Sequence, residues 1–328
     1  MNRLKFFCAA LALVFVLTRL QAQPVNVQQF QNIQQAQQFQ QPLSGQLART
    51  NAPELYPNEN TDTGPQQILH YTPRTKYFDV MLDSQFFYSD NANFSGTSGK
   101  IGSAVYVNTA QFSFMPPERE LGPGKFSGAL GFVSQWYNYG NDDMSALDFN
   151  AQTFFGSARY SVDNWQFGAG LNFTRLLSQD DYAQTYEEWL PALSVQRYFP
   201  INEKLLFAVG NQVDYHFSTV PEVPGSSTEI NNRFDETVSL TLSWQLAHDL
   251  TVQPYYSFQY SNYRYNTLQT SGRNDCLNSF GLTLCYYFTP NFSMRTFFSG
   301  NIKWSDDAQT ASYHEYNEGL GATFTFKF

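Results

Sequence analysis

The sequence predicts an all-β protein, a transmembrane antiparallel up-and-down β-barrel of about 12 strands. Three observations predict it. Many short segments alternate between apolar and polar side chains. Aromatic residues make up 17% of the 328 residues, yet the mean hydropathy is −0.40. Barrels that cross a membrane need this mixture, because lipid-facing and lumen-facing positions alternate along each strand.

The first 22 residues have the features of a secretory signal peptide. Arg3 and Lys5 precede an apolar run over residues 6–17, and Ala22 ends a plausible cleavage site. No later stretch approaches the roughly 20 consecutive apolar residues that a membrane-spanning helix needs. Any crossing of a membrane must therefore be made by strands.

Residues 23–76 are rich in glutamine at their start, and the part before residue 48 is almost uncharged. This composition does not bury enough apolar surface to order itself, so a flexible arm and linker is expected. An alternative stays open, because apolar residues recur every three positions and favour a helix that docks on a partner or enters and plugs the barrel. These residues are Val27, Phe30, Ile33, Ala36 and Phe39.

Residues 77–328 divide into twelve segments of strand length. We predict strands over 77–89, 101–115, 125–138, 147–162, 164–176, 186–199, 203–217, 234–247, 250–264, 276–289, 291–304 and 315–328. The alternation is clearest in the eighth, ninth and tenth segments and least regular in the first, second and fourth. Short turns and long loops follow one another strictly, as expected when one end of a barrel carries turns and the other carries loops.

The last residues form a strand that ends on an aromatic side chain. Phe324, Phe326 and Phe328 share one parity with Leu320, whereas glycine, threonine and lysine occupy the other. On this ending, the signal peptide and the alternating strands, the chain resembles the outer-membrane β-barrel proteins of Gram-negative bacteria, with no subfamily identified. The ending departs from the family's terminal pattern in one position, because Thr323 stands where a glycine is expected.

The resemblance implies several further expectations. The assembly signal would be Phe324, Phe326 and Phe328, recognised by the family's barrel assembly machinery. The barrel would lie in the bacterial outer membrane, in contact with lipid and lipopolysaccharide, with the Gln-rich arm (23–76) and the C-terminus in the periplasm. The chain would act as a monomer or a homo-oligomer.

The predicted lumen is polar, and about 12 strands lie between small filled barrels and wide porins. The candidate pore-lining residues are Asp214, His216, Gln245, Gln253, Gln259, Arg295 and Lys303. Uncharged hydrogen-bonding groups suit neutral solutes such as sugars or nucleosides, whereas Arg295 with Lys303 would suit anions. The first hypothesis is a narrow channel for small polar solutes. A packed polar interior without transport is the alternative, in a surface or scaffold barrel that binds a partner through its loops or arm.

Other chemistry finds less support. Acidic pairs recur in predicted loops and rims, but no calcium-loop spacing is present, so we predict no metal site and no cofactor. A net charge of −9 argues against nucleic acid as a partner. Cys276 and Cys285 lie in one predicted strand about 30 Å apart, too far for a disulfide.

An enzymatic role is not expected. His216 and Ser218 are similar to the His-x-Ser pair of the twelve-stranded outer-membrane phospholipases, which makes a lipid hydrolase a remote alternative. Both side chains are predicted to point into the lumen, whereas such an enzyme acts from its outer face. The asparagine and glycine that follow in that family are also replaced here, by Thr219 and Val220.

Overall fold

The structure is a computed structural model that describes residues 26–38, 76–96, 99–221, 228–265, 272–307 and 310–328. One antiparallel sheet contains thirteen strands in the order β2-β1-β13-β12-β11-β10-β9-β8-β7-β6-β5-β4-β3. The strands are β1 Phe78–Ser89, β2 Ser103–Phe114, β3 Arg119–Leu121, β4 Gly124–Tyr139, β5 Phe149–Val162, β6 Trp165–Ser178, β7 Gln184–Asn202, β8 Leu205–Thr219, β9 Arg233–Ala247, β10 Leu250–Tyr263, β11 Arg273–Thr289, β12 Phe292–Ser305 and β13 Tyr313–Lys327.

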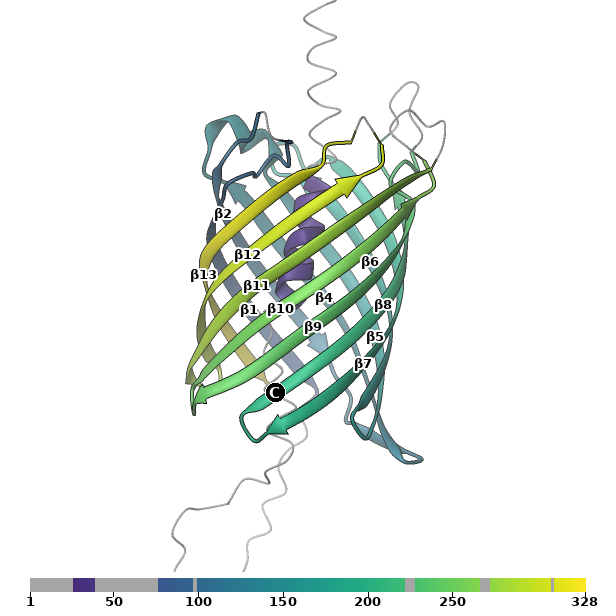
Figure 1. The fold of residues 1–328 in the computed structure, drawn as a ribbon, viewed down its shortest axis with the longest axis vertical. Helices are drawn as coiled ribbons and strands as arrows, with labels where there is room; N and C mark the ends of the chain where they lie inside the picture. The colour runs from purple at the N-terminus through teal and green to yellow at the C-terminus, as the bar shows by residue number, and fades with distance from the viewer. Residues whose placement is uncertain (1–25, 39–75, 97–98, 222–227, 266–271, 308–309) are drawn as a thin grey trace, which may run out of the picture.

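The sheet closes on itself. β2 pairs with β4 as well as with β1, in register from Val105 opposite Tyr139 to Phe114 opposite Leu130. Twelve strands therefore form a closed, tilted barrel wall (Figure 1). Closure leaves no unpaired edge, which is the condition for strands to lie in lipid. The predicted fold class is confirmed.

The thirteenth strand was not predicted. β3 covers only three residues, follows Pro116 and Pro117, and pairs with the first residues of β4 through a tight turn. The sequence analysis placed these residues in a link between two strands. Three residues are too few to show a period of two, so alternation could not identify this strand.

The two ends of the barrel differ. Turns of two residues join β5 to β6, β7 to β8, β9 to β10 and β11 to β12, whereas longer links join the strands at the other end. We name these the short-turn end and the long-link end. The link between β4 and β5 contains the 3-10 helix η1 (Asp142–Leu147). Both β1 and β13 have their outer termini at the short-turn end, where Phe328 lies (Figure 1).

The two faces of each strand have opposite character. On β13, Leu320 is 55% exposed on the outward face, while Glu315 is fully buried inside. β9 repeats the pattern, with Val238 and Trp244 outward and Ser243 inward. The predicted parity is confirmed in these strands. Apolar side chains turned outward and polar ones turned inward match a barrel surrounded by lipid.

Residues 26–38 form a helix inside the barrel (Figure 1). For these residues the structure agrees with the alternative that the sequence left open, a helix that enters the barrel, and not with a flexible arm. The remainder of the predicted arm and the signal peptide lie outside the described residues. No helix in the described part of the chain has the length and hydrophobicity to cross a membrane. Cys276 and Cys285 are free thiols, as predicted.

Candidate functional site

The apolar face of helix 26–38 packs against the barrel wall. Val27, Phe30 and Ile33, spaced three residues apart, are each at least nine-tenths buried. They join one apolar cluster with inward side chains of β1, β2, β4, β5, β6, β7 and β12. The Phe30 ring meets the Tyr137 ring edge to face, with centroids 6.4 Å apart. The lumen therefore contains an apolar patch that this helix covers.

The opposite face of the helix is polar and bonds to inward side chains of β10 and β13. The Gln28 amide donates to the Tyr313 hydroxyl at 3.0 Å. Asn32 donates to the same hydroxyl at 3.3 Å and to Glu315 Oε2 at 3.4 Å. Gln35 donates to Gln259 Oε1 at 3.4 Å. Because an amide side chain both donates and accepts, a Gln-rich helix suits a lumen lined by hydroxyls, amides and carboxylates.

A cavity of about 790 Å³ lies beside the helix. Its wall includes Gln31, Gln34, Gln35 and Gln38 of the helix and inward side chains of the barrel. It extends from Arg159 and Lys327, near the short-turn end, to residues of β7, β8 and β9 near the long-link end. Its lining contains seven formally charged residues apart from His216: Glu118, Arg159, Glu188, Asp214, Arg233, Asp235 and Lys327.

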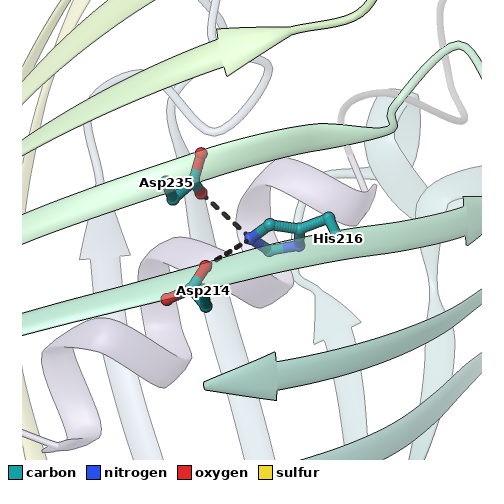
Figure 2. Close-up of side chains that lie close together, drawn as sticks. All are labelled: Asp214, His216 and Asp235. Carbon is teal, nitrogen blue, oxygen red and sulfur yellow. Dashed lines mark ion pairs between the residues drawn. The ribbon is translucent and has the colours of Figure 1, made fainter. Parts of the chain in front are cut away.

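A buried cluster of charges stands at the end of the cavity nearest the long links. His216 Nε2 lies 3.0 Å from Asp214 Oδ1 and 3.0 Å from Asp235 Oδ2. Figure 2 shows Asp214 and His216 on one strand and Asp235 on its neighbour, with their side chains pointing toward one another. The His216 Nδ1 atom lies 3.0 Å from Glu188 Oε2. Arg233 Nε binds Asp235 Oδ2 at 2.9 Å.

The structure brings some of the candidate pore-lining residues together and separates others. Asp214, His216, Gln253 and Gln259 all line the cavity. Arg295 is instead paired with Asp83 at 2.7 Å, and Lys303 with Asp275 at 2.9 Å. Gln245 donates to the backbone of His248 in a short turn.

The three possible metal ligands in this cluster were not predicted. Sequence analysis expected no metal site, yet Asp214, His216 and Asp235 offer ligand atoms within 4.8 Å of one another. Glu188 and Arg233, which complete the cluster, were not singled out. The missing signal was strand register, since His216 pairs with Arg233 and Asp214 with Asp235 across the consecutive strands β8 and β9, and the long link between them leaves that register undefined in the sequence.

The structure also shows the contacts of His216 and Ser218, the two residues that resemble the His-x-Ser pair of outer-membrane phospholipases. Ser218 is buried, and its hydroxyl donates to Asn232 Oδ1 at 3.1 Å. His216 Nε2 contacts carboxylates and Arg233. The serine hydroxyl is thus directed to an amide oxygen, whereas nucleophilic catalysis needs a base within hydrogen-bond reach of it.

No protein-family model matches the chain, and no curated protein matches it. Among solved structures, an outer-membrane channel from Pseudomonas putida F1 is similar, with a TM-score of 0.50 and 9% identity over 80% of this chain and 100% of that one. The NanC porin is similar at a TM-score of 0.43 and 14% identity, over 74% of this chain and 98% of that one. At this level of identity the likeness concerns the fold, which is that of outer-membrane β-barrels.

Proposed function

We propose that this protein is a narrow channel in a bacterial outer membrane for small polar solutes, and that helix 26–38 restricts its path. The observation that carries the proposal is the polar cavity of about 790 Å³ beside the helix. A polar cavity inside an apolar outer surface is the arrangement of a barrel that holds water across a membrane. Twelve strands give a lumen between filled barrels and open porins.

The charges of the lumen favour neutral solutes over anions. Arg295 and Lys303 are each paired with a carboxylate, so neither offers an uncompensated positive charge. The cavity lining has four acidic and three basic residues, and glutamine amides supply much of the rest. Amides and hydroxyls can replace the water around a sugar or a nucleoside at little electrostatic cost. The solutes we propose are therefore uncharged and hydroxyl-rich.

The helix determines how much of the lumen is available. Its apolar face packs against the wall, and its polar face bonds to side chains of β10 and β13. Gln28 contacts Tyr313, the first residue of β13 at the long-link end, whereas Gln35 contacts Ser257 near the middle of β10. Residue 26 is thus nearer the long links. If the short turns face the periplasm, this part of the predicted periplasmic arm lies inside the barrel at the depth of the membrane, and its N-terminal end is directed toward the cell exterior.

Planar-bilayer recording tests the channel. We compare the processed full chain with a variant lacking residues 23–72 and with Phe30→Asp, which puts a carboxylate into the apolar cluster. Both variants should conduct more than the parent chain, because the helix no longer occupies the lumen. His248→Ala is the matched control, since His248 is an exposed residue of a short turn and does not line the cavity.

The recordings have clear alternatives. No conductance from any of these proteins would overturn the channel and support the scaffold barrel, in which the helix is a permanent filling. Conductance that is equal with and without residues 23–72 would retain the channel and overturn the role of the helix. A liposome-swelling panel of sugars, nucleosides and organic anions then tests the solute class, and faster entry of anions would contradict it.

A further inference from the structure

Two carboxylates face each other across the β8–β9 pair. Asp214 and Asp235 are directly opposite in register, and both are buried. Like charges at directly opposite positions destabilise a strand pair, and a buried charge is costly unless it is paired. The position therefore requires positive charge between the two carboxylates. The group that lies there is the imidazole of His216, which is 5% exposed.

The Nε2 atom of His216 lies close to both hydrogen-bond acceptors and a hydrogen-bond donor, and it cannot satisfy them together. It is 3.0 Å from one oxygen of Asp214 and 3.0 Å from one of Asp235, and 3.2 Å from Nη2 of Arg233. A proton on Nε2 would satisfy a carboxylate but would point at a guanidinium donor. A lone pair on Nε2 would accept from Arg233 but would face two anionic oxygens. A cation bound by Nε2 and both oxygens satisfies all three lone pairs at once.

The other nitrogen of the ring supplies a second observation. His216 Nδ1 is buried and has no aligned hydrogen bond, although Glu188 Oε2 lies only 3.0 Å away. Metal-binding histidines usually donate their second N–H to a carboxylate, which fixes the tautomer. Here Glu188 is itself held by the Tyr186 hydroxyl. A small rotation of the imidazole ring would align Nδ1–H with Glu188.

Charge balance agrees with a divalent ion. Glu188, Asp214 and Asp235 contribute three negative charges and Arg233 one positive charge, which leaves −2 when His216 is neutral. Arg233 Nε bonds both oxygens of Asp235, at 3.0 and 2.9 Å, so an ion at Oδ2 requires the guanidinium to shift toward the Tyr263 ring, whose centre is 5.2 Å away. Gln212 and Gln259 donate to Asp214 and Asp235 and orient both carboxylates.

We infer that Asp214, His216 and Asp235 bind a divalent transition metal ion at the long-link end of the cavity. One nitrogen and two carboxylate oxygens are ligands that zinc accepts, at about 2.0–2.2 Å in a tetrahedron. Tetrahedral ligands at those distances stand about 3.3–3.5 Å apart, so the present 3.0 Å contacts widen by a few tenths of an ångström. All three residues line the cavity, which supplies the entry path and a free coordination position.

Zinc titration of the purified full chain in detergent tests the site, with isothermal calorimetry and equilibrium dialysis as readouts. The parent chain should bind one Zn²⁺ ion, and His216→Ala and Asp214→Asn should lose that binding. Glu188→Gln keeps all three ligands and should weaken binding roughly 10–100-fold. His248→Ala is the matched control, because His248 is an exposed histidine in a short turn at the other end of the barrel.

A spectroscopic measurement on the unmutated chain keeps the test independent of how well the variants fold. Co²⁺ in a tetrahedral site of this kind absorbs visible light strongly, and Zn²⁺ should remove the band as it displaces Co²⁺. Two results would overturn the inference: Zn²⁺ binding that survives in folded His216→Ala, or a parent chain that takes up no Zn²⁺ and shows no tetrahedral Co²⁺ band. Neither measurement depends on conductance, so the site stands or falls separately from the channel.

Discussion

At the residue scale, several of the charges inside this barrel are paired with an opposite charge. Arg295 Nη1 and Nη2 both bind the carboxylate of Asp83, at 2.7 and 2.9 Å, and Thr323 donates to the same group. These side chains come from β12, β1 and β13, so one ion pair and one hydrogen bond connect the first strand of the barrel with its last two. Bidentate pairing of this kind combines charge with fixed geometry.

Asp83→Ala should destabilise the barrel. It leaves a buried guanidinium without its bidentate partner, which costs about 3 kcal/mol in the free energy of unfolding. Urea unfolding in lipid vesicles, followed by tryptophan fluorescence, measures the change. Asp180→Ala removes an exposed acidic residue at the long-link end and should shift stability by less than about 0.5 kcal/mol. Equal unfolding midpoints for both variants would show that the contact contributes nothing.

At the element scale, the helix and the strands around it have complementary patterns. The first, second and fourth predicted strands had the least regular alternation. Their counterparts β1, β2 and β5 carry inward apolar residues, Phe87, Val105 and Phe149 among them, that pack in the cluster with Val27, Phe30 and Ile33. The strands with irregular alternation are thus the ones whose inward apolar side chains contact the helix. This irregularity in the sequence could have predicted that an apolar element packs inside the barrel at these strands.

Strand positions were otherwise predictable, because a period of two is a local property of the chain. The location of helix 26–38 was not, since a three-residue recurrence says that a helix has an apolar face and does not say what covers it. The charged cluster could not be predicted from the sequence for a similar reason. Glu188, His216 and Asp235 belong to three strands, and only the register of the closed sheet places them together.

Phe30→Ala should release the helix from the wall. Truncating a buried phenylalanine costs about 3–5 kcal/mol, and Phe30 is 3% exposed. That loss is large for an element whose other lumen contacts are two smaller apolar side chains, Val27 and Ile33, and side-chain hydrogen bonds. Hydrogen exchange read by mass spectrometry should show fast exchange over residues 26–38 in this variant and slow exchange in the parent chain. Exchange in Gln38→Ala should stay slow, and protection that persists in Phe30→Ala would contradict the docking described here.

The final residue extends the pairing between the first and the last strand of the barrel. Phe328 donates from its backbone to Phe78 and accepts from Tyr77 and Phe78, and its ring stacks on that of Phe78 with centroids 5.8 Å apart. Phe328→Ala keeps the backbone bonds and removes the ring. Phe288, another exposed phenylalanine near the short-turn end, is the natural comparison.

Phe328→Ala should reduce the amount of assembled barrel in the outer membrane of expressing cells more than Phe288→Ala does, while both fold equally well from urea into lipid vesicles. The reason is that only Phe328 belongs to the terminal pattern by which assembly machinery is expected to recognise the last strand. Membrane fractionation with immunoblotting gives the amounts. Similar losses for the two variants in cells would show that the terminal ring is not a signal.

At the scale of the whole molecule, the two faces of the barrel wall are suited to different surroundings. Outward residues such as Leu130, Leu171 and Leu193 are exposed although they are apolar, and this is reasonable only in lipid. Inward residues are buried although they are polar, and many of them bond to one another and to the helix. The channel proposed above would open by exchanging helix contacts for water, which would let its closed state be stable while its path stays hydrophilic.

Immersion in lipid predicts a dependence on depth. Leu193 is 61% exposed near the middle of β7, and Leu246 is 41% exposed one residue before the end of β9. Leu193→Arg should cost about 2–4 kcal/mol of folding free energy in lipid vesicles, and Leu246→Arg only about 0–1 kcal/mol, because the cost of a charge falls from the midplane toward the interface. Urea titrations in lipid vesicles measure both values. Equal small costs would mean that the outer face of the barrel is not surrounded by hydrocarbon. Only in a bilayer does the free-energy cost of an outward arginine depend on its position along the strand.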